Sequence, residues 1–200
     1  MSISDKIEEN KVIFISGTPC TGKTTIATKL NDFLTNNGFN SYFIKINDFA
    51  IENDLVLGKD PDKLYTVIDI GRLDEVLNKE INNFLDENSS DDSKIVVVEG
   101  HLSHLCNGAD KMIILRLNPE KLLKRLEERK YSENKIHENL EAEALAVCSA
   151  EAYDLYDDKA SEIDTTNKSV DETLELVLKI ITGELESPVG SVDFMDWFLL

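Results

Sequence analysis

The stretch GTPCTGKTT at residues 17–25 constrains this chain more than any other feature of its sequence. It follows the apolar run VIFIS (12–16) and precedes a segment of helical length that begins IATKL. The pattern G-x-x-x-x-G-K-T between a strand and a helix is a complete Walker A sequence. In such a loop the glycines let successive backbone N–H groups turn toward phosphate oxygens. We therefore predict that the loop binds a nucleoside triphosphate.

The side chains of this loop have separate expected roles. Lys23 is expected to reach the β- and γ-phosphates, the Thr24 hydroxyl to join the shell of a Mg²⁺ ion, and Thr25 to lie beside the α-phosphate. ATP and Mg²⁺ are thus the expected cofactors. Three further members of the loop are expected to act through their backbone, which makes thiol chemistry unexpected: Gly17, Cys20 and Gly22.

Apolar runs of strand length alternate with amphipathic segments of helical length along the chain. This alternation predicts an α/β fold with a parallel sheet and helices on both of its faces. Strands are predicted at 12–16, 42–46, 95–99 and 112–117, with a weaker fifth at 161–164. Helices are predicted at 23–36, 71–87, 119–129, 132–157 and 169–182, with start signals at Asn118, Ser132 and Ser169.

Composition limits the classes of function. Two hundred residues suffice for one sizeable core. A net charge of −18 argues against general nucleic-acid binding, which needs a basic surface. The three cysteines show no paired spacing, the N-terminus MSISDKIEEN does not resemble a signal peptide, and the longest apolar runs are too short to span a membrane. We therefore expect a cytoplasmic globular protein.

The stretch IVVVEGHLSH (95–104) carries the second chemical signal. Glu99 ends a predicted buried strand, where a carboxylate can hold a Mg²⁺-bound water or orient a nucleophile. A neutral His101 could position a water or a phosphoryl acceptor. Loop packing is the favoured interpretation of His104. A structural zinc site made with Cys106 is disfavoured because the spacing is irregular and lacks a second ligand cluster.

A GTPase switch is also disfavoured. Guanine recognition needs N-K-x-D, and the sequence NKSVD (167–171) has Val170 where the aspartate must stand. The strand that ends at Glu99 is also not followed by D-x-x-G.

Several segments together resemble the atypical adenylate kinases, the adenylate kinase isoenzyme six or CINAP-type family, in their archaeal form. The resemblance covers roughly residues 11–182. It implies a three-layer P-loop nucleoside-monophosphate-kinase fold with a central parallel five-stranded sheet, a monophosphate-binding segment at about 47–68 and a short lid at about 128–138. The matching stretches are GTPCTGKTT, KINDFA, VVVEGHLSH, ILRLNPEKLLKRLEERKYSENKIHENLEAEAL and EIDTTNKSV.

The family's functional positions transfer to this sequence by motif. The acid and the histidine fall on Glu99 and His101, and the lid arginine on Arg129. Lys168 in TTNK would lie near the adenine, while Asp48 and Arg72 are weaker acceptor candidates. Two departures are the Cys20 side chain, where related kinases often have Gly, and Glu99, where eukaryotic members carry aspartate. The phosphate loop of the family falls on Cys20, Gly22, Lys23, Thr24 and Thr25.

The arginines support this interpretation, since phosphoryl transfer needs a cation that closes over the phosphates. Arg129 stands where two predicted helices meet and is expected to fill that role. Arg125 could assist it or pair with Glu128 on the surface, and Arg116 is expected to be structural. A connection of about three residues (KYS) between the helices makes a short lid, which would tolerate competing ATP hydrolysis.

The resemblance implies two activities, phosphoryl transfer from ATP to AMP and an ATPase role in maturing the small ribosomal subunit. The expected partners are AMP or another nucleoside monophosphate, and a basic small-subunit ribosomal protein with the 40S/30S precursor. A primary assembly ATPase with weak kinase activity is the alternative. The tail at 183–200 is predicted to leave the kinase domain (1–182) as an extended strap that packs on the core, docks such a partner or self-associates.

Overall fold

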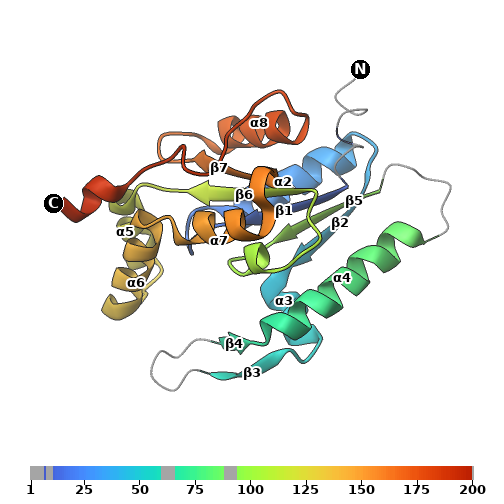
Figure 1. Ribbon diagram of the computed structural model, residues 1–200, viewed down its shortest axis with the longest axis horizontal. Helices are drawn as coiled ribbons and strands as arrows, with labels where there is room; N and C mark the ends of the chain where they lie inside the picture. Colours follow the sequence, from blue (N-terminus) through green and yellow to red (C-terminus); the bar gives the residue numbers. More distant parts are fainter. Residues whose placement is uncertain (1–6, 8–10, 60–65, 88–93, 200) are drawn as a thin grey trace.

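A five-stranded parallel sheet forms the centre of the protein (Figure 1). The structure is a computed structural model that describes residues 7, 11–59, 66–87 and 94–199. Most of the N-terminal stretch MSISDKIEEN, part of the monophosphate-binding segment expected at about 47–68 and most of the polar stretch ENSSDDSK (87–94), which its composition predicts to be a loop, lie outside these residues. The sheet order is β2–β5–β1–β6–β7, from strands Asn40–Lys45, Lys94–Glu99, Val12–Ser16, Lys111–Arg116 and Ala160–Asp164. All five predicted strands are confirmed within two residues.

Alternation of side chains along the strands builds one apolar cluster on each face of the sheet. In β1, Val12 and Phe14 point to one face, while Ile13 and Ile15 point to the other. The strands are apolar on both faces because helices cover both, as parallel sheets require. The first face packs against α3 (Ile46–Glu52), α4 (Ile70–Asp86) and α7 (Val147–Tyr156), and the second against α2 (Lys23–Asn36) and α8 (Val170–Ile181). The chain is therefore an α/β protein of three layers, as predicted.

The helices begin and end close to the predicted positions. Asn118 accepts a hydrogen bond from the backbone N–H of Glu120, and Ser169 forms a complete capping box with Glu172. Ser132 occupies the N-cap of α6 without a side-chain hydrogen bond. The bounds are α2 Lys23–Asn36, α3 Ile46–Glu52, α4 Ile70–Asp86, α5 Pro119–Glu128, α6 Glu133–Ala144, α7 Val147–Tyr156 and α8 Val170–Ile181, with 3-10 turns at Ser103–Leu105, Asp157–Lys159 and Met195–Leu199.

The predicted single helix at 132–157 is wrong, because the chain breaks between α6 and α7. Ala146 adopts a left-handed conformation with φ 55°. In an uninterrupted helix the Glu143 carbonyl would accept from the N–H of Val147. Here it accepts instead from the N–H of Ala146 (3.1 Å) and from Nη2 of the buried Arg116 (2.7 Å). A tertiary contact has thus replaced the local one.

Three elements between β2 and α4 were not predicted individually. Helix α3 follows β2 directly, and strands β3 (Val56–Lys59) and β4 (Thr66–Ile68) form a separate antiparallel pair. Figure 1 shows this pair beyond the end of α4, away from the main sheet.

The C-terminal tail packs along β7, the edge strand of the sheet (Figure 1). Pro188 bridges to Ser161 in antiparallel fashion, and the carbonyl of Ser187 accepts from the N–H of Glu162 (2.9 Å). Further on, Trp197 packs against an apolar cluster between α5 and α6 that contains Leu117, Leu122, Leu126 and Leu140. Among the described residues, no helix has the length and apolar character needed to cross a membrane.

Candidate active site

The phosphate loop connects β1, the central strand, to α2. Gly17 adopts φ 136°, and a Cβ atom there would lie 2.4 Å from the backbone oxygen of Leu115. Gly22 has φ 108° and forms the N-cap of α2. Each backbone conformation favours glycine, so both glycines of the motif are needed for the path of the loop. Cys20 also has a positive φ (70°), and its side chain packs against the α5–α6 cluster.

Lys23 is buried within this loop, and its ammonium donates to the carbonyl of Thr18 (2.9 Å). Burial lowers the pKa of Lys23, while the nearby carboxylates Glu99 and Glu143 act in the opposite direction. A cation placed between a loop of backbone N–H groups and an open cavity can follow the charge of a γ-phosphate.

Thr24 and Glu99 come together from neighbouring elements. Thr24 is at the start of α2 and Glu99 at the end of β5, and the Thr24 hydroxyl donates to the Glu99 carboxylate at 3.1 Å. Both side chains offer oxygen atoms, which Mg²⁺ prefers, and both line the cavity beside Lys23. The donor set therefore fits Mg²⁺ held together with phosphate oxygens.

His101 contacts the carbonyl group of Gly17, next to the Thr18 carbonyl that accepts from Lys23. Its Nδ1 is 3.2 Å from the carbonyl oxygen of Gly17, which can only accept, so Nδ1 carries the proton and Nε2 keeps its lone pair. Although the ring is exposed to the open cavity, the surrounding protein reduces its solvation and, with the charge of Lys23, lowers its pKa to about 4. A neutral imidazole with an unprotonated nitrogen is what the positioning of a water or an acceptor would require.

His104 has a different environment. It is buried, with Nδ1 2.7 Å from the Ser16 hydroxyl and Nε2 2.8 Å from the carboxylate of Glu151. Both ring nitrogens thus have protein partners, and the side chain is absent from the cavity lining. This arrangement agrees with the loop-packing interpretation.

A large cavity of about 910 Å³ opens in front of the phosphate loop. One wall comes from α3, β4, the start of α4 and the loop after β5, and it carries mostly apolar side chains together with Asn47. The opposite wall comes from α6 and the α5–α6 connection. The apolar wall consists of Ile51, Val67, Ile68, Ile70, Leu102 and Leu105. A wall of this kind suits the flat face of a nucleobase.

A second cavity of about 350 Å³ borders the same phosphate loop. It is bounded by α5 and by the segment that joins β7 to α8. Lys168 lines this cavity and donates to the carbonyl of Asp164 at 2.7 Å. Four residues line both cavities, so the two spaces share the phosphate loop: Cys20, Gly22, Thr25 and Arg129.

Arg129 and Arg125 both lie at the end of α5. Arg129 is the C-cap of that helix, is exposed to solvent and lines both cavities. Arg125 donates from Nη1 to the carbonyl of Cys20 at 3.1 Å, so it contacts the phosphate loop directly. Only four residues, 129–132, separate α5 from α6. Arg129 therefore stands at the start of a short connection between two helices, and Arg125 lies one turn before it in α5.

Most of the predicted site residues line the cavities, but two acceptor candidates do not. Asp48 and Arg72 are both exposed and are absent from both linings, whereas Asn47, next to Asp48, does line the larger one. Contacts of Asp48 and Arg72 with an acceptor therefore stay predictions. Gly17 is also absent from both linings, and its backbone carbonyl contacts the ring of His101.

Sequence reasoning missed the face that α6 turns toward the cavity. Lys135 and Asn139 line the cavity, and Glu143 on the same face is buried behind the phosphate loop. These polar residues recur every four positions, which places them on one side of a helix. That spacing was a usable signal in the sequence.

Comparisons with known proteins identify similar sequences and a similar fold. The AAA-domain family matches residues 13–146. Relatives from Methanothermobacter thermautotrophicus (40% identical, over 94% of this chain and 99% of the relative), Pyrococcus furiosus (37%, 92% and 91%) and Methanocaldococcus jannaschii (36%, 92% and 93%) each carry the name "Putative adenylate kinase".

A solved structure of thymidylate kinase from Candida albicans resembles this chain with a TM-score of 0.53 and 14% identity. The similarity covers 87% of this chain and 92% of that one. At this identity the similarity supports the fold alone, and the fold is that of a P-loop nucleoside-monophosphate kinase.

Proposed function

The chain belongs to the archaeal adenylate kinase family, and from this premise we propose that it transfers the γ-phosphoryl group of ATP to AMP, giving two molecules of ADP. Membership of this family supports nucleoside-monophosphate kinase activity for the chain. The choice of AMP as acceptor, an accompanying ATPase activity and a cytoplasmic location are parts of the proposal.

One observation carries the proposal, namely that two cavities meet at a single phosphate loop. A motor or a switch needs one nucleotide site, whereas a nucleotide kinase must hold a donor and an acceptor on opposite sides of the transferred group. The smaller cavity, with Lys168, suits the adenosine of ATP. The larger cavity, with its apolar wall and Asn47, suits the monophosphate.

The residues around the loop can then divide the work of transfer. An acceptor oxygen attacks the γ-phosphorus while the bond to the β–γ bridging oxygen breaks, and that oxygen leaves on ADP. Lys23 and Arg129 neutralise the charge on the transferred group. Thr24 and Glu99 would hold Mg²⁺, which supplies further charge neutralisation when it is bound. His101, neutral and with Nε2 unprotonated, would position the acceptor or a water.

A second candidate function is a primary assembly ATPase that acts on a basic small-subunit ribosomal protein. The tail is the observation that favours it. Its tip exposes Met195, Phe198 and Leu199 beside the acidic residues Asp193 and Asp196. Apolar anchors with acidic neighbours suit a basic partner.

Product assays distinguish the two functions. ADP formation is measured with ATP alone, with ATP and each nucleoside monophosphate in turn, and with ATP and candidate ribosomal proteins. We expect rapid ADP formation only when AMP is present, with slow hydrolysis of ATP alone. Stimulation by a ribosomal protein and by no monophosphate would contradict the kinase proposal and support the assembly factor.

A further inference from the structure

Thr18 is the residue of the phosphate loop whose carbonyl contacts the Lys23 ammonium. Its carbonyl accepts from the ammonium of Lys23 (2.9 Å), from the hydroxyl of Thr21 (2.9 Å) and from the N–H of Thr21 (3.3 Å). The residue is 1% exposed. The position of the Lys23 ammonium therefore depends on where Thr18 is held.

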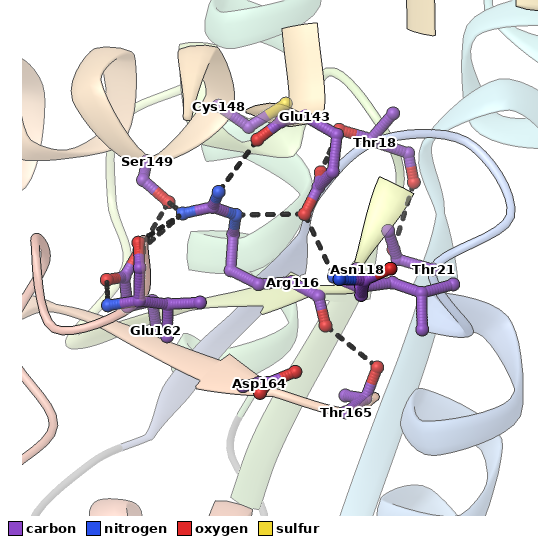
Figure 2. A network of polar contacts seen from close by, with 12 residues as sticks. Thr18, Thr21, Arg116, Asn118, Glu143, Cys148, Ser149, Glu162, Asp164 and Thr165 are labelled. Carbon is purple, nitrogen blue, oxygen red and sulfur yellow. Dashed lines mark hydrogen bonds and ion pairs between the residues drawn. The ribbon is translucent and has the colours of Figure 1, made fainter. Parts of the chain in front are cut away.

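Thr18 is held from outside the loop by one carboxylate. Its hydroxyl donates to Oε2 of Glu143, whose other oxygen accepts from Nε of Arg116 (2.9 Å) and from the N–H of Leu117 (2.9 Å). Figure 2 shows Glu143 between the Arg116 guanidinium and Thr18. Both oxygens of a buried carboxylate are thus in use, as burial of a charge requires.

Arg116 is itself fixed on its far side. Its Nη1 donates to Glu162 (3.0 Å), and Ser149 donates to the same Glu162 oxygen (2.8 Å). The ring of Phe194, from the tail, lies 5.3 Å from the guanidinium carbon. Figure 2 shows Ser149 and Glu162 on the side of Arg116 away from Thr18. The guanidinium therefore has little freedom to turn, and it can hold Glu143 in one place.

Glu143 also links the loop to the helix pair that carries Arg129. It lies in the last turn of α6, on the face that lines the larger cavity through Asn139. The break at Ala146 ends α6 directly after this contact. One side chain thus ties the phosphate loop to the helices that bound the cavity.

We propose that Glu143 is a positioning residue for nucleotide binding, which holds Thr18 and, through the Thr18 carbonyl, the Lys23 ammonium at the place of the phosphates. The proposal rests on the proposed function only in that the loop binds ATP. A merely structural ion pair would stabilise the fold without changing affinity for nucleotide, and this difference can be measured.

The test compares three variants of the full chain by isothermal titration calorimetry with Mg-ATP, together with thermal unfolding. Thr18→Val keeps the shape and removes the hydroxyl, and we expect it to bind ATP about tenfold more weakly, a loss of about 1.4 kcal/mol. Thr18→Ser keeps the hydroxyl and should bind within about twofold of the wild type. Ser149→Ala loses a bond in the same network on the side away from the loop. It should lower the melting temperature yet bind ATP normally.

A fourth variant keeps the proposal testable if Thr18→Val does not fold. Glu143→Asp retains the charge beside Arg116 but withdraws the carboxylate by one methylene, so it should also weaken ATP binding. Wild-type affinity in Thr18→Val, or in Glu143→Asp where the first does not fold, would overturn the proposal. Equal losses of affinity in Thr18→Val and Ser149→Ala would also overturn it. These titrations contain no AMP, so a failure of the kinase proposal would be seen separately, as wild-type protein that binds ATP but forms no ADP with AMP.

Discussion

Two consecutive carbonyl groups of the phosphate loop accept hydrogen bonds from the two side chains with the clearest expected roles in transfer. Gly17 accepts from His101, and Thr18 accepts from Lys23. The charge of Lys23 is one cause of the lowered pKa of His101. Burial and the charge of Lys23 favour the neutral imidazole, whereas the Gly17 carbonyl acts in the opposite direction and decides which ring nitrogen carries the proton.

The first residue-scale prediction concerns Lys23→Ala. Because the variant removes the cation that follows the γ-phosphate, we expect transfer and hydrolysis to fall by at least about 10²-fold. Lys29→Ala serves as the matched control, since Lys29 is an exposed lysine on the same helix that pairs with Asp171. Both variants should keep wild-type circular dichroism. Near-wild-type turnover in Lys23→Ala would refute the assignment of the phosphate loop.

The second residue-scale prediction concerns pH. The pKa of His101 is about 4 in the folded protein and near 6.5 in the unfolded chain, so between these values the unfolded state binds more protons. The contribution of neutral His101 to stability is complete above about pH 6.5 and is lost as the pH falls toward 4. In urea unfolding at pH 7 and pH 5, His101→Gln should lose less free energy of unfolding than the wild type. Identical losses in the two proteins would show that His101 is not the group responsible.

At the scale of elements, the pair α5–α6 brings a cation to the phosphate loop from a distant part of the chain. Leu122 and Leu126 of α5 pack with Leu140 of α6, while the short connection carries Arg129 to both cavities. Arg125 of the same helix donates to the carbonyl of Cys20, a contact that neither interpretation included, and its assistance to Arg129 stays a prediction. The apolar side chains thus hold the two helices together, and the connection between them places Arg129 at both cavities.

Arg129→Lys tests this element. Lysine keeps the charge but loses the planar fork that can bind two phosphate oxygens, so we expect turnover to fall by about tenfold or more while ATP affinity changes little. Steady-state kinetics and calorimetry measure the two effects. Lys124→Ala, which removes an exposed charge from α5, is the control and should behave as the wild type. Wild-type turnover in Arg129→Lys would place this arginine outside the transfer step.

The same scale shows what the sequence could and could not predict. The inner strands β1, β5 and β6 were predictable because both of their faces are buried, and the capped helices because their caps are local. The α6–α7 break was not, since it depends on Arg116, 27 residues away in sequence, binding the Glu143 carbonyl. The sequence predicted which segment forms the cavity wall but not which side chain lines it. Asn47 lines the cavity and Asp48 does not, and this difference depends on the residue at which α3 begins.

At the scale of the whole molecule, the tail closes the exposed edge of the sheet. An edge strand presents unpaired backbone groups, and β7 meets Ser187 and Pro188 there. Beyond this point the N–H of Val192 donates to the buried Glu162 carboxylate at 2.6 Å. The tail is therefore packed against the core, while its last turn still exposes the side chains that a partner could contact.

The last prediction follows from this packing. A chain that stops after Glu186 leaves the buried Glu162 without Ser187 and Val192 and removes Phe194 from Arg116. Loss of these contacts should lower the melting temperature by more than about 5 °C, since 1 kcal/mol corresponds to about 2–4 °C in a chain of this size. Leu199→Ser, at a side chain that is 83% exposed, is the control and should melt as the wild type does.

The wild type itself offers a second measurement of the same prediction. Trp197 is the only tryptophan, and it is half-buried against the α5–α6 cluster. Because the tail is part of the core, its fluorescence should change in the same transition as the circular dichroism of the helices. An earlier fluorescence transition, with unchanged melting of the truncated chain and loss of binding to a basic ribosomal protein, would show instead that the tail is a docking segment held only weakly by the sheet.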